Sequence, residues 1–119
     1  MAKTILIVDD EDGIRDLLVE YFAAKGYNIL EATDGVEALN YFTLKQIDLI
    51  ISDIRMPRMS GLQLLKAVKK ININLPVILI TGYQVYNSYT TELTIKADGY
   101  ISKPFTLDTI NKLVVDLLK

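Results

Sequence analysis

The chain has 119 residues, of which half are hydrophobic and 24% are charged, so it suits one compact domain over residues 1–119. Its net charge of −2 and scattered basic residues argue against direct nucleic-acid binding, and no apolar stretch approaches the roughly 20 residues that span a membrane. The absence of cysteine and histidine excludes disulfides, Cys-His and Ser-His-Asp catalysis and His-ligated zinc, so any metal must be held by oxygen. A cytoplasmic location is the simplest interpretation.

Five short apolar runs are typical of β-strands. They cover residues 4–9, 28–32, 48–53, 76–81 and 99–102. Three of the runs are almost wholly apolar, which is expected for central strands of a parallel sheet that is covered on both faces.

Amphipathic stretches separate these runs and predict helices. In the first stretch the apolar residues recur at helical spacing and predict a single buried face: Ile14, Leu17, Leu18, Tyr21 and Phe22. The last stretch starts near residues 106–108 and has a similar apolar stripe, formed by Ile110, Leu113, Val114 and Leu117. A further stretch, residues 86–95, is rich in Ser, Thr and Tyr and predicts only a short, marginal helix.

Two of the predicted helices begin with capping signals. Asp34 with Glu37, and Ser60 with Gln63, have the spacing of a capping box. The inward residues expected on the first of these helices are Val36, Leu39 and Phe42, and on the second Leu62, Leu65 and Val68. The whole pattern is (βα)5, an α/β fold in which right-handed crossovers produce a doubly wound parallel sheet.

Polar residues follow four of the five predicted strands. The first strand ends in Asp9 and Asp10, the third in Asp53, the fourth in Thr81 and the fifth near Lys103. Parallel strands end at the same edge of a sheet, and ligands bind in the crevice outside those ends. If the first and third strands are neighbours, the three carboxylates form one cluster, with the threonine and the lysine on its other side.

The predicted cluster suits divalent-cation and phosphoryl chemistry. Three carboxylates in one pocket repel one another, and a hard cation such as Mg²⁺ with oxygen ligands removes that penalty. A metal beside Asp53 would bring in a phosphoryl group, for which Asp53 would be the nucleophile. Lys103 would supply a positive charge for a phosphoryl oxygen, and Thr81 a hydroxyl donor.

Simpler roles compete with each of these assignments. Asp10 or Glu11 could cap the first helix, and the helix dipole accounts for Glu11 and Asp12. Capping explains one acid well but not four in a row. Taken alone, Thr81 would be an ordinary strand residue and Lys103 a surface lysine, so both gain a functional interpretation only as members of the set.

Four stretches of the chain together resemble the receiver domain of bacterial two-component response regulators. They are "ILIVDDEDGIRDLL", "DLIISDIRMPRMSGLQLL", "PVILITG" and "ADGYISKPF", and the resemblance extends over essentially the whole chain. It implies a five-stranded flavodoxin-like sheet with the strand order 2-1-3-4-5, which the chemotaxis member of this family has. It also implies a cis peptide bond between Lys103 and Pro104.

The resemblance implies a role for each site residue. Asp53 would accept phosphate from a sensor histidine kinase or a histidine phosphotransfer protein. Asp9, Asp10 and Asp53 would hold Mg²⁺ together with the main-chain carbonyl of Arg55, while other residues would contact the phosphoryl group: Thr81 and Lys103. The domain would not be an enzyme beyond catalysing its own aspartyl phosphorylation and dephosphorylation.

A conformational switch also follows from the resemblance. Tyr100 stands three residues before Lys103, where the family has a rotating aromatic, and its ring can swing inward when Thr81 turns toward a phosphoryl oxygen. Four of the seven tyrosines lie within residues 83–100, so this face is predicted to be the output surface. The tyrosines in the weak helix could instead pack against each other.

The sequence departs from the family pattern at Lys96 and has bulky side chains at two positions that vary in the family. Lys96 stands where the family usually has a glycine that ends the fourth helix, so that helix is expected to end differently or to be partly disordered. Arg55 and Tyr83 occupy the variable positions two residues beyond Asp53 and Thr81, where bulky side chains could shield an acyl phosphate from water.

Two other classes of function compete with a phospho-acceptor switch. One is a receiver-like interaction module whose phosphorylation is not used. The other is an aspartate-nucleophile phosphohydrolase, which would want a second acid two residues after the nucleophile, where this chain has Arg55. The output partner would be a downstream effector protein or a C-terminal output domain that is absent from this chain.

Overall fold

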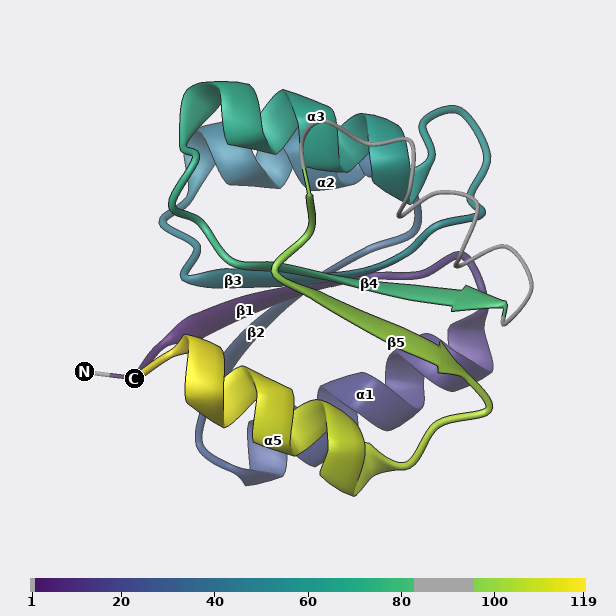
Figure 1. Cartoon of the computed structure of the whole chain (residues 1–119), viewed down its shortest axis with the longest axis vertical. Helices are drawn as coiled ribbons and strands as arrows, with labels where there is room; N and C mark the ends of the chain where they lie inside the picture. Colours follow the sequence, from purple (N-terminus) through teal and green to yellow (C-terminus); the bar gives the residue numbers. More distant parts are fainter. Residues whose placement is uncertain (1, 83–95) are drawn as a thin grey trace.

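Five parallel strands in the order β2-β1-β3-β4-β5 form the centre of the protein (Figure 1). The computed structural model describes residues 2–82 and 96–119. The strands are β1 (Thr4–Val8), β2 (Asn28–Ala32), β3 (Leu49–Asp53), β4 (Val77–Gly82) and β5 (Gly99–Lys103). The helices are α1 (Asp12–Ala24), α2 (Gly35–Leu44), α3 (Gly61–Ile71) and α5 (Leu107–Leu117). The doubly wound α/β fold and its strand order are therefore confirmed, whereas the helix predicted at 86–95 lies outside the described residues.

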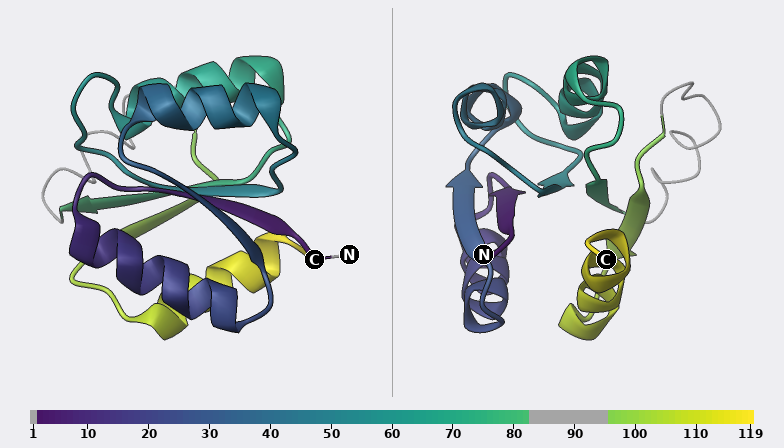
Figure 2. Two further views of the ribbon diagram at one scale, coloured as in Figure 1. Left: turned by 180° about the vertical axis from the view of Figure 1, so that it is seen from behind. Right: turned by 90° about the vertical axis from the view of Figure 1, so that its left-hand side faces the viewer.

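The sheet is covered on both faces. Helices α2 and α3 lie on one side and α1 and α5 on the other (Figure 2). Because successive side chains of a strand point to opposite faces, Leu6 and Ile50 belong to the α2/α3 core, whereas Ile7 and Ile51 belong to the α1/α5 core. This explains why the central strands are apolar over most of their length, with polar residues such as Ser52, Asp53 and Thr81 near the carboxyl ends of β3 and β4. None of the helices in the described part of the chain is long and apolar enough to cross a membrane.

The capping signals in the sequence correspond to real helix starts. Ser60 and Gln63 form the complete capping box, with hydrogen bonds of 2.9 and 3.2 Å between each side chain and the other residue's backbone N–H. Asp34 accepts a hydrogen bond from the backbone N–H of Glu37 at 2.9 Å. The Glu37 side chain, however, accepts from the backbone N–H of Thr33 at 2.7 Å. The second half of that predicted box is therefore displaced by one residue.

The predicted apolar face of α1 is only partly correct. Leu18 and Phe22 are buried, but Leu17 is 46% exposed. Consecutive residues of a helix are about 100° apart around its axis, so Leu17 lies at the edge of the stripe that Leu18 and Phe22 define. On α2, similarly, Leu39 is only half-buried. On α1 and α2, the set of residues buried against the sheet is therefore narrower than the apolar periodicity predicts.

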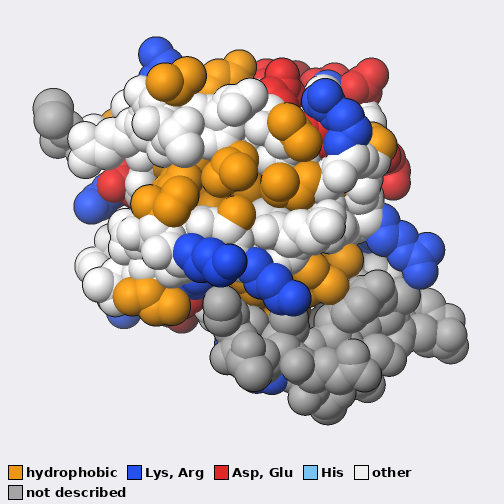
Figure 3. Space-filling model, turned by 90° about the horizontal axis from the view of Figure 1, so that it is seen from above, with side chains coloured by type: hydrophobic (Ala, Val, Ile, Leu, Met, Phe, Trp, Pro, Cys, Tyr) orange, Lys and Arg blue, Asp and Glu red, His pale blue; other side chains and the backbone are white. Residues whose placement is uncertain are grey.

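The outer face of α2 and α3 retains apolar side chains. Figure 3, which views this face from above, shows a band of hydrophobic side chains across its centre. Leu44 at the end of α2 and Ile71 at the end of α3 are 79% and 64% exposed. Packing within the described residues therefore leaves most of these two side chains uncovered.

A buried lysine joins α3 to the far edge of the sheet, opposite the strand ends that carry the acidic residues. The Lys69 ammonium donates hydrogen bonds to the carbonyls of Ile73 at 3.0 Å and Leu75 at 2.6 Å, and to Asp98 Oδ2 at 2.7 Å. Asp98 Oδ2 also accepts from the backbone N–H of Val77 at 2.8 Å. The charge of Lys69 is thus fully paired although the residue is only 5% exposed.

Candidate carboxylate and phosphoryl site

The sheet register brings the predicted site residues to one edge. Strand β1 runs beside β3, as a single carboxylate cluster requires, and β4 separates β3 from β5. Each of the three acids, Asp9, Asp10 and Asp53, offers a carboxylate oxygen, and these oxygens lie within 4.8 Å of one another. The described residues contain no other cluster of this kind. The predicted carboxylate cluster is therefore present.

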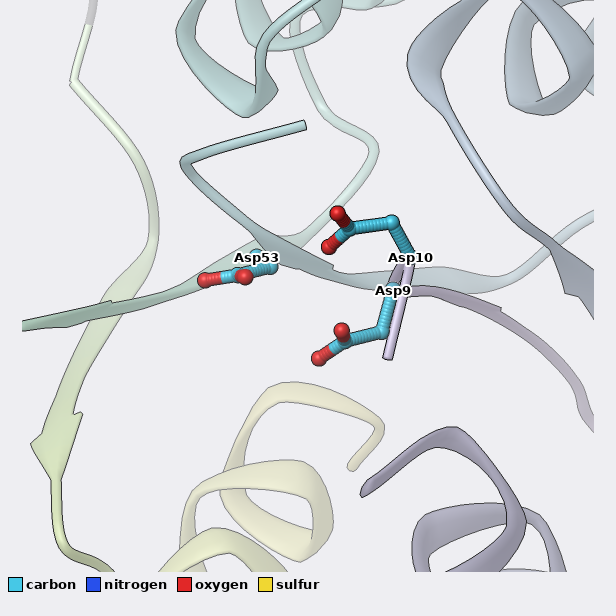
Figure 4. Close-up of side chains that lie close together, drawn as sticks. All are labelled: Asp9, Asp10 and Asp53. Atoms are coloured by element: carbon cyan, nitrogen blue, oxygen red, sulfur yellow. The ribbon is translucent and has the colours of Figure 1, made fainter. Parts of the chain in front are cut away.

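The three carboxylates approach from different sides. Figure 4 shows Asp9 on the side of α1 and α5, and Asp10 on the side of α2 and α3, with Asp53 on the neighbouring strand at a level between them. Asp9 and Asp53 are buried, whereas Asp10 is exposed. The cluster thus has a buried floor and one side that opens to solvent.

Burial raises the pKa of the two inner carboxyls. Desolvation raises the pKa of Asp9 from its ordinary value of 3.8 to about 6, against the effect of the hydrogen bond that its Oδ1 accepts from Glu11 N–H at 2.9 Å. Desolvation also raises the pKa of Asp53, although the nearby Lys103 charge opposes it. Asp9 Oδ2 is buried and has no hydrogen-bond partner among the described residues. A cation would supply the missing interaction and favour the ionised forms.

Lys103 lies at the edge of the cluster, as predicted. Its Nζ is 3.5 Å from Asp53 Oδ2 and 3.8 Å from a Glu11 carboxylate oxygen. The other Asp53 oxygen accepts a hydrogen bond from Ile54 N–H at 3.0 Å. The peptide bond between Lys103 and Pro104 is cis, which confirms the expectation from the family resemblance.

The predicted switch residues lie on neighbouring strands. Thr81 is buried, and its hydroxyl donates to the Gly82 carbonyl at 3.1 Å. Tyr100 is half-buried and packs against the α2/α3 core, while its hydroxyl accepts a hydrogen bond from Ala97 N–H at 3.3 Å. Most of the predicted output surface, including Tyr83 and the other tyrosines before residue 96, lies outside the described residues, as does the end of the helix expected before Lys96.

The loop between β3 and α3 forms one wall of the site. A cavity of about 460 Å³ beside the cluster is lined by Asp10, Ile54, Arg55, Met56, Ser60 and Leu62. A hydrogen bond joins the two ends of this loop, since Gly61 N–H donates to the Ile54 carbonyl at 2.8 Å. A Cβ at Gly61 would lie 2.2 Å from the Asp53 carbonyl oxygen, so only glycine fits there. Because Arg55 and Asp10 both line this cavity, Arg55 lies beside the carboxylate cluster.

Arg15 is a supporting residue that the sequence patterns did not indicate. Its side chain is only 12% exposed, and its Nη1 donates to the Asp9 carbonyl at 2.7 Å. The same guanidinium also pairs with Asp12 and with Glu31 on β2. The spacing of Asp12 and Arg15 on one helix could have indicated the first pair. The contacts with Asp9 and Glu31 depend on the tertiary fold.

Comparison with known proteins identifies a family. The family model for the response regulator receiver domain matches residues 5–115. Sporulation initiation phosphotransferase F of Bacillus subtilis is 38% identical over 114 residues, which are 96% of this chain and 92% of that protein. Regulatory protein AtoC of Escherichia coli is 40% identical over 92% of this chain, which spans only 24% of AtoC.

Solved structures agree with this assignment. The response regulator protein TrrA from Thermotoga maritima, solved in complex with Mg²⁺-BeF, is 40% identical with a TM-score of 0.87, over 98% of this chain and 99% of that one. The chemotaxis response regulator CheY4 of Vibrio cholerae is 30% identical with a TM-score of 0.90, over 99% of this chain and 100% of that one.

Proposed function

The chain belongs to the response regulator receiver domain family, and on this basis we propose which of its residues perform the phospho-acceptor function. The domain is a phospho-acceptor switch of two-component signalling. We infer that Asp53 is the residue that accepts the phosphoryl group. The observation that carries this assignment is the buried Asp53 carboxylate at the end of β3, between two further carboxylates and the Lys103 ammonium.

The carboxylate cluster fits a magnesium ion. Asp9, Asp10 and Asp53 offer only oxygen, and the buried Asp9 Oδ2, which has no hydrogen-bond partner within residues 2–82 and 96–119, would be stabilised by a cation. The exposed side of the cluster leaves room for the water molecules that Mg²⁺ retains. We assign these three carboxylates and the main-chain carbonyl of Arg55 as the metal ligands, and the Mg²⁺-BeF complex of TrrA supports this choice. When bound, Mg²⁺ would neutralise charge on the phosphoryl oxygens.

The reaction that these residues support is a phosphoryl transfer to a carboxylate. An Asp53 oxygen attacks the phosphorus of a phosphohistidine, so that an O–P bond forms as the N–P bond breaks and the imidazole leaves. Lys103 is already 3.5 Å from Asp53 Oδ2 and can pair with a phosphoryl oxygen. The Thr81 hydroxyl, which now donates to Gly82, can rotate and donate to the phosphoryl group instead. Attack of water on the same phosphorus would later restore the free carboxylate.

The switch is proposed to work through Thr81 and Tyr100. If Thr81 turns toward a phosphoryl oxygen, it vacates space beside β5, and the Tyr100 ring can move further into the protein. Its present hydrogen bond from Ala97 would then break. We propose that this movement changes the surface of residues 83–100, which a downstream partner would recognise.

The phosphoryl donor is proposed to be a sensor histidine kinase or a histidine phosphotransfer protein. The output is proposed to be a downstream effector protein or an output domain on a longer chain. Both kinds of relative support this proposal, since this chain spans 92% of the Bacillus phosphotransferase but only 24% of AtoC. The domain is proposed to catalyse only its own phosphorylation and dephosphorylation. A cytoplasmic location is proposed with these partners.

The decisive experiment is intact mass spectrometry after incubation with Mg²⁺ and a small phosphodonor such as acetyl phosphate. The parent should gain one phosphoryl group only when Mg²⁺ is present. The Asp53→Asn variant should gain none, while Asp16→Asn, which removes an exposed carboxylate from α1, should behave like the parent. An adduct that persists in Asp53→Asn would refute the assigned acceptor. Absence of both an adduct and Mg²⁺ binding in the parent would favour a receiver-like interaction module.

A further inference from the structure

The loop that borders the carboxylate cluster contains a strained backbone. Arg58 has a φ of 67°, which residues with side chains seldom adopt. The N–H of Met59 donates to the carbonyl of Pro57 at 2.7 Å, so residues 57–59 form a γ-turn with Arg58 at its centre. A γ-turn with positive φ is the rare and strained form. Such a conformation persists only when surrounding contacts hold it.

Those contacts come from the N-terminus of α2. The Arg58 Nε and Nη2 donate to Asp34 Oδ2 at 2.9 and 2.5 Å, and Asp34 is only 4% exposed. The pKa of Asp34 lies below its ordinary value, first because Glu37 N–H donates to it and next because Arg58 does. Beside this ion pair, Gly35 N–H donates to the Met59 carbonyl at 3.2 Å. A Cβ at Gly35 would lie 2.7 Å from that oxygen, so the two segments are in close contact.

The geometry points to a role for this ion pair in cation binding. The turn at 57–59 begins two residues after Arg55, and the same loop lines the cavity beside Asp10. We propose that the Arg58–Asp34 pair is a positioning contact, which holds the loop so that the Arg55 carbonyl can reach a cation at the cluster. This inference rests on the proposed function, because it assumes that Mg²⁺ binds there.

For replacement of Arg58 by a neutral residue, simple electrostatics predicts a change in Mg²⁺ affinity opposite to the one that loss of a positioning contact predicts. Removing the positive charge of Arg58 reduces repulsion of a nearby cation, so a purely Coulombic effect would strengthen Mg²⁺ binding. Loss of a positioning contact would weaken it instead, since residues that orient metal ligands are typically worth 10- to 100-fold in affinity. The direction of the change therefore separates the two explanations.

The test is a calorimetric titration of the folded protein with Mg²⁺ alone. Arg58→Ala should weaken binding by about 10-fold, and Arg58→Lys, which keeps the charge but not the two-nitrogen contact, should weaken it less. Arg58→Gly accepts the positive φ without strain, yet it should still lose affinity because the ion pair is gone. Lys66→Ala removes an exposed charge from α3 and should leave the affinity within about twofold of the parent.

Asp34→Asn provides the complementary variant, because asparagine keeps the helix cap while the ion pair is lost. Asp34→Asn should weaken Mg²⁺ binding, and combining it with Arg58→Ala should add little further loss. Unchanged or tighter binding in Arg58→Ala, with the parent binding normally, would overturn the inference. Fully additive losses in the double variant would overturn it as well. A parent that binds no Mg²⁺ would refute the proposed metal site and the inference together.

Discussion

Replacing Asp9 with asparagine should stabilise the metal-free protein while it abolishes metal binding. Asp9 is 1% exposed, and its Oδ2 has no hydrogen-bond partner among the described residues. Its charge is therefore unfavourable in the folded state unless a cation is bound. Asparagine has nearly the same shape, and its oxygen can still accept the hydrogen bond that Glu11 N–H donates at 2.9 Å.

The size of the effect follows from the raised pKa of Asp9. The pKa rises from 3.8 to about 6, and each pKa unit corresponds to about 1.4 kcal/mol. The folded state therefore binds this proton more tightly than the unfolded state does. Between pH 4 and about 6, stability due to this group falls as pH rises, and above that range the loss is complete. Allowing for relaxation around the site, we expect Asp9→Asn to gain about 1 to 3 kcal/mol at pH 7.

Urea denaturation followed by circular dichroism measures this difference. In EDTA, the difference in free energy of unfolding between Asp9→Asn and the parent should be small near pH 4 and largest at pH 7. Adding Mg²⁺ should stabilise the parent but not the variant, because only the parent binds the ion. Asp16→Asn serves as the exposed control and should show neither effect. A variant no more stable than the parent in EDTA at pH 7, or a gain that does not depend on pH, would refute the reasoning.

Two further substitutions test the parts of the fold that support the site. Lys69→Met should lower the free energy of unfolding by about 2 to 4 kcal/mol, because it removes the ammonium that pairs with Asp98 and donates to two backbone carbonyls. Urea denaturation should show no comparable loss in the exposed-lysine control, Lys70→Met. Gly61→Ala should cost about 3 kcal/mol and reduce phosphorylation, because the new Cβ would lie 2.2 Å from the Asp53 carbonyl oxygen. Parent-like stability and phosphoryl uptake in this variant would contradict the close contact.

Most of the site could be predicted because it depends on where strands end. Asp9, Asp53 and Lys103 each follow or finish an apolar run, and parallel strands align such positions without any knowledge of side-chain packing. The 2-1-3-4-5 order, by contrast, came from the family resemblance, since the pattern of apolar runs does not specify which strands are neighbours. Local capping was also predictable at Ser60, where both partners lie within one turn.

The contacts that join distant segments were not predictable. Arg58 and Asp34 are 24 residues apart, and Lys69 and Asp98 are 29 apart. Hydrophobic periodicity indicates which face of a helix is buried, but it carries no information about which polar group lies across from it. Leu17 shows the same limit, because the width of the buried stripe depends on how the helix rests on the sheet.

The sequence by itself therefore determined the succession of strands and helices, the edge at which the acids gather and the restriction to oxygen ligands. Periodicity and residue chemistry are local properties, so they can be inferred from the order of residues alone. Only the tertiary structure decided that the Asp9 carboxylate is buried and that one of its oxygens lacks a partner among the described residues. Only the tertiary structure, likewise, showed that Arg58 holds a strained turn against α2. Burial and long-range pairing arise when segments far apart in the chain come together, and these determine the electrostatics of the site.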